Sequence, residues 1–272
     1  MIVTAIVDGS GAQNVNLGQW TIYASSSTWS RDDSAEIYGN LTTSTGQELS
    51  SYLGSARGLV ATWYDQSGAG NNASQGTRSN QPNIQKSSKG PGWSVVCAND
   101  SLIGMSYTVL NNTNYSFSVV ERRNYESTTG MYLISSGNNT ANQGLHFGYV
   151  TPGTIVRFGQ YQNDIDINPY PGYSYTDEPM HYWLGTQSST SGRFLYEKGI
   201  VTVSDATKTT LLSSTSGNFQ VSKYLASTTQ GFSGEIYEVI VWKRALTITE
   251  AKQVYNNQYG YINGNPGSII FS

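Results

Sequence analysis

The chain has 272 residues, a net charge of −3, and only 12% charged residues beside 20 Tyr and 29 Gly. Its length fits one large β-sandwich, and a composition rich in hydroxyl, amide and aromatic side chains is typical of strands and turns. The sequence has no basic cluster for nucleic-acid binding and no apolar run long enough to span a membrane, so we expect neither nucleic-acid binding nor membrane insertion.

Residues 1–30 hold short β-like pieces separated by Gly, Ser and Asn, which predicts a lead-in segment or an edge strand. The first residues lack the basic start and apolar core of a secretory signal peptide, so no signal is visible. Further on, Thr45 and Glu48 form a capping-box pattern ahead of apolar residues at helical spacing, which predicts a short helix over 46–53.

A predicted strand at Leu59–Tyr64 runs into a loop made of Asp, Ser, Gly and Asn. Such residues close tight turns, because Asp and Asn side chains bond to nearby backbone and Gly accepts positive φ. Asp65 has two interpretations: its carboxylate clamps the loop, or it binds calcium together with neighbouring amide oxygens. Calcium is the only cofactor that the sequence suggests. The residues expected to pack beside the core or to hold the loop are Trp63, Tyr64, Ser67, Gly68 and Asn71.

After the first third of the chain, nearly every segment predicts a strand. Gly199 takes the positive-φ position of a predicted hairpin, and Thr247 and Glu250 form a capping box for a helix that ends at about Tyr259, before Gly260. Many strands and a terminal helix, without β-α alternation, predict an all-β, sheet-on-sheet domain. The predicted strands are 93–97, 105–109, 115–122, 130–135, 144–149, 154–161, 181–187, 193–198, 200–203, 218–225 and 233–242.

Asp164 and Asp166 lie two residues apart in a run of alternating polar and apolar residues. On a strand such a pair shares one face, with Cα atoms roughly 6–7 Å apart, a separation that suits a pair of glycosidase carboxylates. Asn168, Tyr170 and Tyr173 follow, and they supply amide and ring groups that suit a sugar. Three interpretations follow: an exposed loop with solvated carboxylates, a sugar-binding loop, or a catalytic pair.

Other signatures of chemistry are weak. His146 and His181 have no second His or Cys at metal-ligand spacing, so each is expected to be an ordinary, partly buried strand residue. The sequence contains neither a phosphate-binding Gly-rich loop nor a GxSxG nucleophile elbow. The single cysteine, Cys97, lies in a predicted strand and is expected to be a packed thiol rather than a nucleophile.

Two stretches resemble a known family. Residues Gly58–Gln75 and Gln81–Ile84 are similar to the WYDQSGxGNxxxQ…QPxI signature of concanavalin A-like, laminin-G-like jelly-roll domains related to the catalytic domain of fungal arabinofuranosidase B. Domains of this kind occur in phage and virus surface proteins. Residues Gly234–Glu250 resemble the GxIxExxxxxRxLTxxE ending of the same superfamily.

The resemblance implies a two-sheet antiparallel jelly roll over residues 31–262, with one or two short helices, a concave face often used for glycans, and a loose tail at 263–272. It implies no catalytic residue. The enzymes are expected to carry a vicinal cysteine pair and a nucleophile in an Asp-Leu-Glu-Asn-Gly-like stretch, and this sequence has neither.

These observations predict a non-enzymatic carbohydrate-binding or attachment module on an extracellular or virion surface, whose partner is a glycan or glycoprotein surface. One alternative is a glycoside hydrolase of arabinofuranosidase type. Another is a structural capsid or fibre protein whose jelly roll packs against copies of itself or against other virion proteins.

Overall fold

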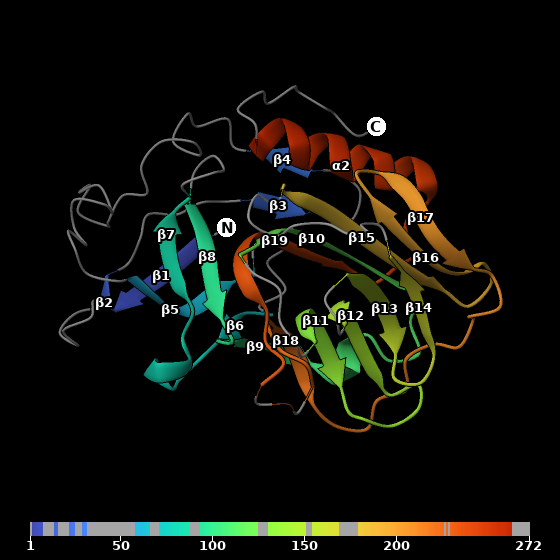
Figure 1. Cartoon of the computed structure of the whole chain (residues 1–272), viewed down its shortest axis with the longest axis horizontal. Coiled ribbons are helices and arrows are strands. Elements are labelled where there is room, and N and C mark those ends of the chain that lie inside the picture. Colours follow the sequence, from blue (N-terminus) through green and yellow to red (C-terminus); the bar gives the residue numbers. More distant parts are fainter. Residues whose placement is uncertain are drawn as a thin grey trace.

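The computed structural model shows a chain built almost entirely from β-strands, with a helix near its C-terminal end (Figure 1). Short 3₁₀ turns lie at η2 (Arg78–Asn80) and η3 (Tyr107–Val109). The residues that the structure describes are 2–7, 14–15, 22–24, 29–31, 58–65, 71–87, 93–124, 130–150, 154–168, 179–225, 227 and 229–262.

Most of the strands form two packed layers in which every paired neighbour is antiparallel. In order across the first layer, the strands are β14 (Asp164–Ile167), β13 (Ile155–Gln160), β12 (Gly144–Val150), β11 (Met131–Gly137), β18 (Asn218–Val221), β9 (Leu102–Ser106) and β6 (Ala73–Ser74). The second layer has the order β17 (Ile200–Asp205), β16 (Gly192–Glu197), β15 (His181–Ser188), β10 (Tyr115–Arg123), β19 (Ser233–Trp242), β8 (Trp93–Ala98) and β7 (Asn83–Lys86).

One strand links the two layers. Strand β5 (Gly58–Tyr64) pairs with β6 of the first layer and with β7 of the second. It also pairs with β1 (Ile2–Val7), which in turn pairs with β2 (Asn14–Val15). A separate hairpin joins β3 (Ile22–Ala24) to β4 (Trp29–Arg31). The arrangement confirms the predicted all-β, two-layer antiparallel sandwich.

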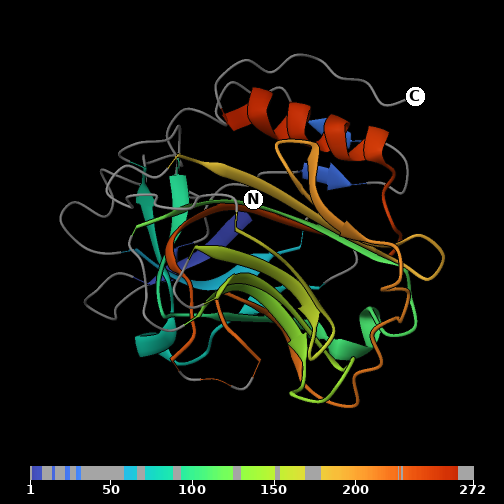
Figure 2. The ribbon, with the colours of Figure 1, turned by 45° about the vertical axis from the view of Figure 1, so that its right-hand side comes forward.

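The core lies between the layers, which Figure 2 shows one above the other. Phe117 of β10 packs against Phe147 of β12 and Phe158 of β13, with ring centroids 4.9 Å apart in both pairs. Because side chains alternate along a strand, each strand of the first layer also presents a row of residues on its outer face, which points away from the second layer. That outer row carries the candidate site.

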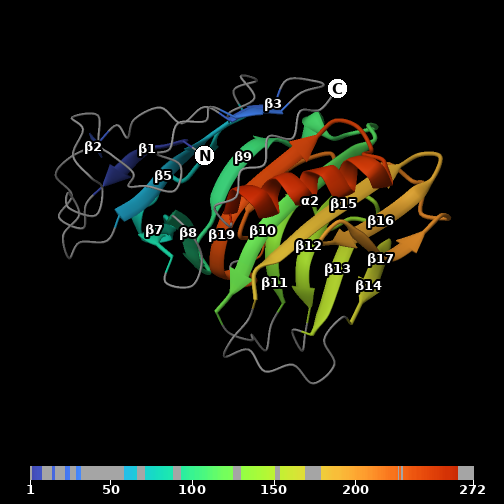
Figure 3. The ribbon, with the colours of Figure 1, turned by 90° about the horizontal axis from the view of Figure 1, so that it is seen from above.

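Helix α2 (Ile248–Ile262) packs on the outer face of the second layer (Figures 2 and 3). Its Ala251 and Val254 contact Leu184 of β15 and Tyr196 of β16 in a small apolar cluster. The helix therefore lies on the opposite side of the sandwich from the outer face of the first layer. None of the helices in the described part of the chain has both the length and the apolar character needed to cross a membrane.

The predicted capping box of this helix is confirmed. The Thr247 N–H donates to Glu250 Oε2 at 2.8 Å, and the Glu250 N–H donates to Thr247 Oγ1 at 3.3 Å. Each side chain therefore satisfies a backbone donor that the first helical turn would leave without a partner.

Replacing Thr247 with alanine is expected to lower the free energy of unfolding by about 1 kcal/mol, because the Glu250 N–H loses its acceptor. Urea denaturation measures the change. Thr247→Ser keeps the hydroxyl and is expected to stay within about 0.5 kcal/mol of the parent. An equal loss in both variants would contradict the capping role.

The predicted hairpin is also confirmed, whereas three predicted elements, the C-terminal helix and the strands at 105–109 and 218–225, differ from the structure by three residues or more at an end. Gly199 has φ +72° in the β16–β17 turn. Helix α2 continues past the predicted stop at Gly260 as far as Ile262. Strand β9 spans 102–106 instead of 105–109, because the Ser106 hydroxyl accepts the Thr108 N–H at 3.4 Å and starts a 3₁₀ turn.

Strand β18 ends at Val221, short of the predicted 218–225, because Ser222 and Leu225 take positive φ values of 62° and 41°. The helix predicted over 46–53 and the tail predicted at 263–272 lie outside the described residues.

Candidate functional site

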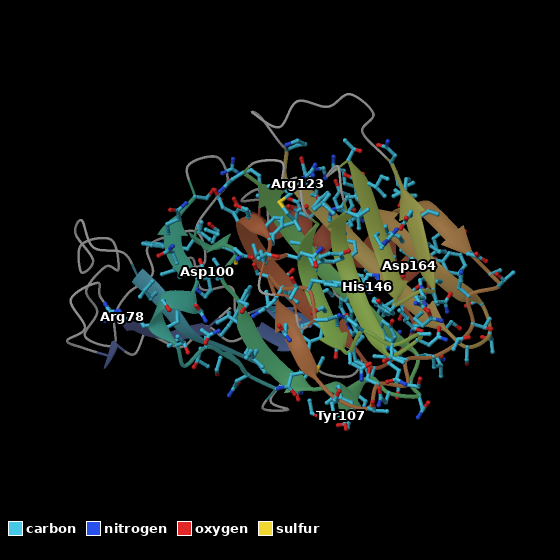
Figure 4. The ribbon with its side chains drawn as sticks, turned by 60° about the horizontal axis from the view of Figure 1, so that its bottom comes forward. Arg78, Asp100, Tyr107, Arg123, His146 and Asp164 are labelled. Carbon is cyan, nitrogen blue, oxygen red and sulfur yellow. The ribbon has the colours of Figure 1, made fainter. Side chains whose placement is uncertain are left out.

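Polar side chains from neighbouring strands meet on the outer face of the first layer. Phe147 of β12 and Phe158 of β13 point into the core, so the adjacent His146 and Arg157 point outward. The side chains of β14 alternate in the same way: Ile165 and Ile167 point into the core, and Asp164 and Asp166 point outward. Figure 4 looks onto this face, with His146 labelled beside Asp164.

Arg157 contacts both aspartates. Its Nε and Nη2 donate to Oδ1 and Oδ2 of Asp166 at 2.8 and 2.7 Å, and its Nε lies 3.4 Å from Asp164 Oδ2. Two parallel, charge-assisted hydrogen bonds hold the guanidinium and the Asp166 carboxylate in a fixed relative orientation. The hydrogen bonds to Asp166 raise the pKa of Arg157 despite its partial burial. The segment is therefore a strand with ion-paired carboxylates, so the predicted loop is wrong, whereas the Asp166 side chain is exposed as that interpretation expects.

The buried ring of His146 contacts Asp164 on the side that faces away from solvent. Its Nδ1 lies 3.0 Å from the Gly144 carbonyl oxygen. Its Nε2 lies 3.1 Å from Asp164 Oδ1. Burial alone would raise the pKa of Asp164, but contact with His146 and the charge of Arg157 outweigh it, so the pKa lies below the ordinary value. Asp164 is therefore a carboxylate at neutral pH.

A glycine makes room for the pair of His146 and Asp164. A Cβ atom on Gly159 of β13 would lie 1.8 Å from Asp164 Oδ1 and 2.8 Å from His146 Nε2. Both separations are shorter than any real contact of a Cβ atom. Only a residue without a side chain at this position allows the two groups to meet across β13.

Two tyrosines border the charged groups. The rings of Tyr132 in β11 and Tyr224 have centroids 4.3 Å apart and are tilted by 31°. Each also meets the His146 ring nearly edge to face, at 5.8 and 5.6 Å. Burial raises the pKa of both phenols, that of Tyr224 to about 12, so both remain neutral hydroxyl groups at neutral pH. We call Tyr132, His146, Arg157, Asp164, Asp166 and Tyr224 the β11–β14 site.

The turn that carries Tyr224 is fixed by hydrogen bonds to β11 and β18. The Leu225 N–H donates to Ser135 Oγ at 2.9 Å, and Gln220 Nε2 donates to the Leu225 carbonyl oxygen at 3.0 Å. The Ser222 N–H donates to the Leu133 carbonyl oxygen at 2.7 Å. The position of Tyr224 is therefore set by the sheet, as a binding ring requires.

The accessible part of the site is the pair of Arg157 and Asp166. Their side chains are 31% and 38% exposed, that of Asp164 is 20% exposed, and that of His146 only 2%. A ligand on this face would therefore meet carboxylate and guanidinium groups first, with His146 behind them.

The other sequence-predicted residues lie elsewhere or outside the described residues. Asn168 is exposed just beyond β14, while Tyr170 and Tyr173 are not described. Trp63 of β5 is half-buried and packs against the core; for Tyr64 only the backbone, in β5, is described. Ser67 and Gly68 also lie outside the described residues.

Asp65 clamps its loop through reciprocal hydrogen bonds. The Asp65 N–H donates to Asn72 Oδ1 at 3.0 Å, and the Asn71 N–H donates to Asp65 Oδ2 at 2.9 Å. These contacts are the ones that the clamp interpretation requires. Calcium binding at Asp65 stays a prediction. Among the described residues, no group of three or more His, Cys, Asp and Glu side chains is placed to hold a metal ion.

Sequence reasoning missed four of the six site residues. The sequence pattern predicts an ordinary strand role for His146 and no site role for Arg157, Tyr132 and Tyr224. One signal does point to His146. Apolar residues alternate with other residues along 144–150, and this pattern places His146 on the strand face that points away from the core. The other contacts depend on which strands are neighbours.

The ion pairs of Asp164 predict a pH-dependent stability. Because its pKa is lowered on folding, the carboxylate adds stability above the ordinary value of 3.8, and that stability is lost as the pH falls through the lower pKa of the folded protein. We expect Asp164→Asn to unfold about 1 kcal/mol more easily at pH 7. The difference should vanish near pH 2 in urea titrations. An equal difference in the free energy of unfolding between the variant and the parent at pH 7 and pH 2 would contradict the stabilising role of the ionised Asp164 carboxylate.

No family model and no curated protein matches the sequence. Among solved structures, Trypanosoma rangeli sialidase in complex with 2,3-difluorosialic acid has a TM-score of 0.53 at 10% identity, over 74% of this chain and 32% of that chain. Its complex with 2,3-difluoro-KDN has a TM-score of 0.51 at 11% identity, over 74% and 31%. Domain 4 of a GH43 extracellular arabinanase from Geobacillus stearothermophilus has a TM-score of 0.49 at 13% identity, over 81% and 95%. The chain spans about a third of the sialidase chains, and at this identity their likeness shows the fold alone.

Proposed function

We propose that the chain is a non-enzymatic carbohydrate-binding or attachment module that takes a glycan on the β11–β14 site. The observation that carries the proposal is the fixed pair of Arg157 and Asp166 on an outward strand face beside a tyrosine pair. Sugars present hydroxyl groups that both donate and accept, so an array of carboxylate acceptors and guanidinium donors can bind them. The Tyr224 ring adds an apolar face with a polar hydroxyl at its edge.

The charges of the site favour binding over hydrolysis. A glycosidase needs one carboxyl group whose pKa is raised so that it can protonate the leaving oxygen. Asp164 has the opposite property, because contact with His146 and the charge of Arg157 lower its pKa. Asp166 is held by two hydrogen bonds from Arg157. Glycoside hydrolysis that disappears in Asp164→Asn would instead support the hydrolase alternative.

The proposed location is an extracellular or virion surface. Support comes from the resemblance of the strand-loop motif at residues 58–75 to jelly-roll domains that occur in phage and virus surface proteins. Light scattering in solution tests the structural alternative. A symmetric oligomer without affinity for any glycan would favour a capsid or fibre protein over an attachment module.

A glycan array followed by calorimetric titration of the strongest ligand tests the proposed site. We expect Tyr224→Ala and Arg157→Ala each to weaken binding about tenfold or more, because each removes a contact group from the accessible face. Tyr259→Ala is the matched control, since this tyrosine is 50% exposed on α2 at the opposite side of the sandwich. Absence of any glycan ligand at millimolar concentration would overturn the proposal.

A further inference from the structure

We propose that the β11–β14 site selects neutral sugars and rejects acidic ones. The inference rests on the proposed function and narrows its ligand class. It follows from the way in which the charges of the site are already paired.

The accessible cation of the site already pairs with a carboxylate on one of its two bidentate edges. A guanidinium binds a carboxylate best through two parallel N–H groups. Arg157 uses Nε and one N–H of Nη2 in this way for Asp166, and the same Nε lies 3.4 Å from Asp164 Oδ2. An incoming sugar carboxylate could reach only the outer Nη1 and Nη2 N–H groups, and it would share a guanidinium whose charge already pairs with Asp166.

Two carboxylates would also repel an acidic ligand at close range. Asp164 and Asp166 are 20% and 38% exposed, while Arg157 is 31% exposed. The nearby guanidinium of Arg193 and the imidazole of His146 are buried, at 0% and 2% exposure. A ligand that approaches from solvent therefore meets two negative groups and one positive group whose charge is already shared. The charge of Arg193 helps to lower the pKa of Asp164, but this guanidinium is buried and does not meet the ligand.

A neutral sugar meets no such penalty. Its hydroxyl groups can donate to lone pairs of Asp164 and Asp166 that Arg157 leaves open, and their oxygens can accept from the N–H groups of Arg157 that do not face Asp166. The Tyr132 and Tyr224 phenols are neutral, so they add hydrogen-bonding groups without charge. Every polar group of the accessible face can thus be satisfied without breaking the existing ion pairs.

Matched glycan pairs that differ by one carboxylate test the inference. Suitable pairs are lactose with 3′-sialyllactose, and a xylo-oligosaccharide with its glucuronic acid-branched form. Array binding and calorimetry at 0.15 M salt are expected to show affinity for the neutral member of at least one pair, tenfold or more above that for its acidic partner. Asp166→Asn should narrow this ratio, because it removes one repelling charge. Asp100→Asn, the same change in the turn between β8 and β9, far from Asp164 in Figure 4, should leave the ratio unchanged.

Three outcomes are decisive. Tighter binding of acidic members, with an affinity that falls steeply as salt increases, would overturn the inference and leave the proposed function standing. Equal binding of both members at the β11–β14 site would also overturn it. Absence of binding to any glycan would overturn the proposed function and the inference together. Circular dichroism verifies that Asp166→Asn is folded, and the comparison of matched pairs on the unmodified chain does not depend on that variant.

Discussion

Replacing Gly159 with alanine is expected to weaken glycan binding more than tenfold while the sandwich remains folded. The new Cβ atom would lie 1.8 Å from Asp164 Oδ1 and 2.8 Å from His146 Nε2, so the carboxylate must leave His146. Asp164 is 20% exposed and can move toward solvent, which limits the loss of unfolding free energy to about 1–3 kcal/mol. Calorimetric titration of the glycan and urea denaturation measure the two effects.

Gly76→Ala is the matched control for this substitution. A Cβ atom at Gly76 would meet nothing within 4 Å, and the residue lies in an exposed stretch after β6. It should change neither affinity nor stability by a measurable amount. If Gly159→Ala binds the glycan as tightly as the parent chain, the contact between His146 and Asp164 does not shape the binding face.

Replacing Glu235 with alanine is expected to lower the free energy of unfolding by about 3–5 kcal/mol. Glu235 is 1% exposed and forms an ion pair with Arg122, which is 8% exposed. Its carboxylate also accepts hydrogen bonds from the hydroxyls of Tyr237, Ser87 and Ser94. Removal of the carboxylate leaves the buried guanidinium without its partner. Urea denaturation at pH 7 measures the loss.

Two comparisons separate this burial effect from a general cost of losing an ion pair. Arg244→Ala breaks an exposed pair with Glu250, whose side chains are 48% and 31% exposed, and should cost less than about 1 kcal/mol. Arg122→Leu combined with Glu235→Leu removes both buried charges and should be more stable than Glu235→Ala. An equal loss of unfolding free energy in Glu235→Ala, Arg244→Ala and the double leucine variant would contradict a specific cost of leaving a buried charge without its partner.

The overall fold could be predicted because its signals are local. Alternation of polar and apolar residues along 115–120 and 144–149 gives half-buried strands without knowledge of their neighbours. The Thr247 capping box and the Gly199 turn are each set by residues a few positions apart. Errors occurred where the deciding contact was a single side chain, as at Ser106, or where Gly260 remained helical because the surrounding helix continued.

The candidate site could be predicted only in part. The spacing of Asp164 and Asp166 was enough to place both on one face, because that relation holds within one strand. His146 and Arg157 join them through the register of β12, β13 and β14, which no local pattern fixes. Tyr224 depends on a turn whose positive-φ residues are Ser222 and Leu225 rather than glycines, so nothing in the sequence marks it.

Hydrogen–deuterium exchange with and without a bound oligosaccharide tests the central claim most directly. The β11–β14 site predicts slower exchange in residues 131–137, 144–150, 155–167 and 220–225 on addition of the ligand. Exchange in α2, which packs on the outer face of the second layer, should stay the same. Slower exchange confined to α2 and the second layer would contradict the assignment of the binding face.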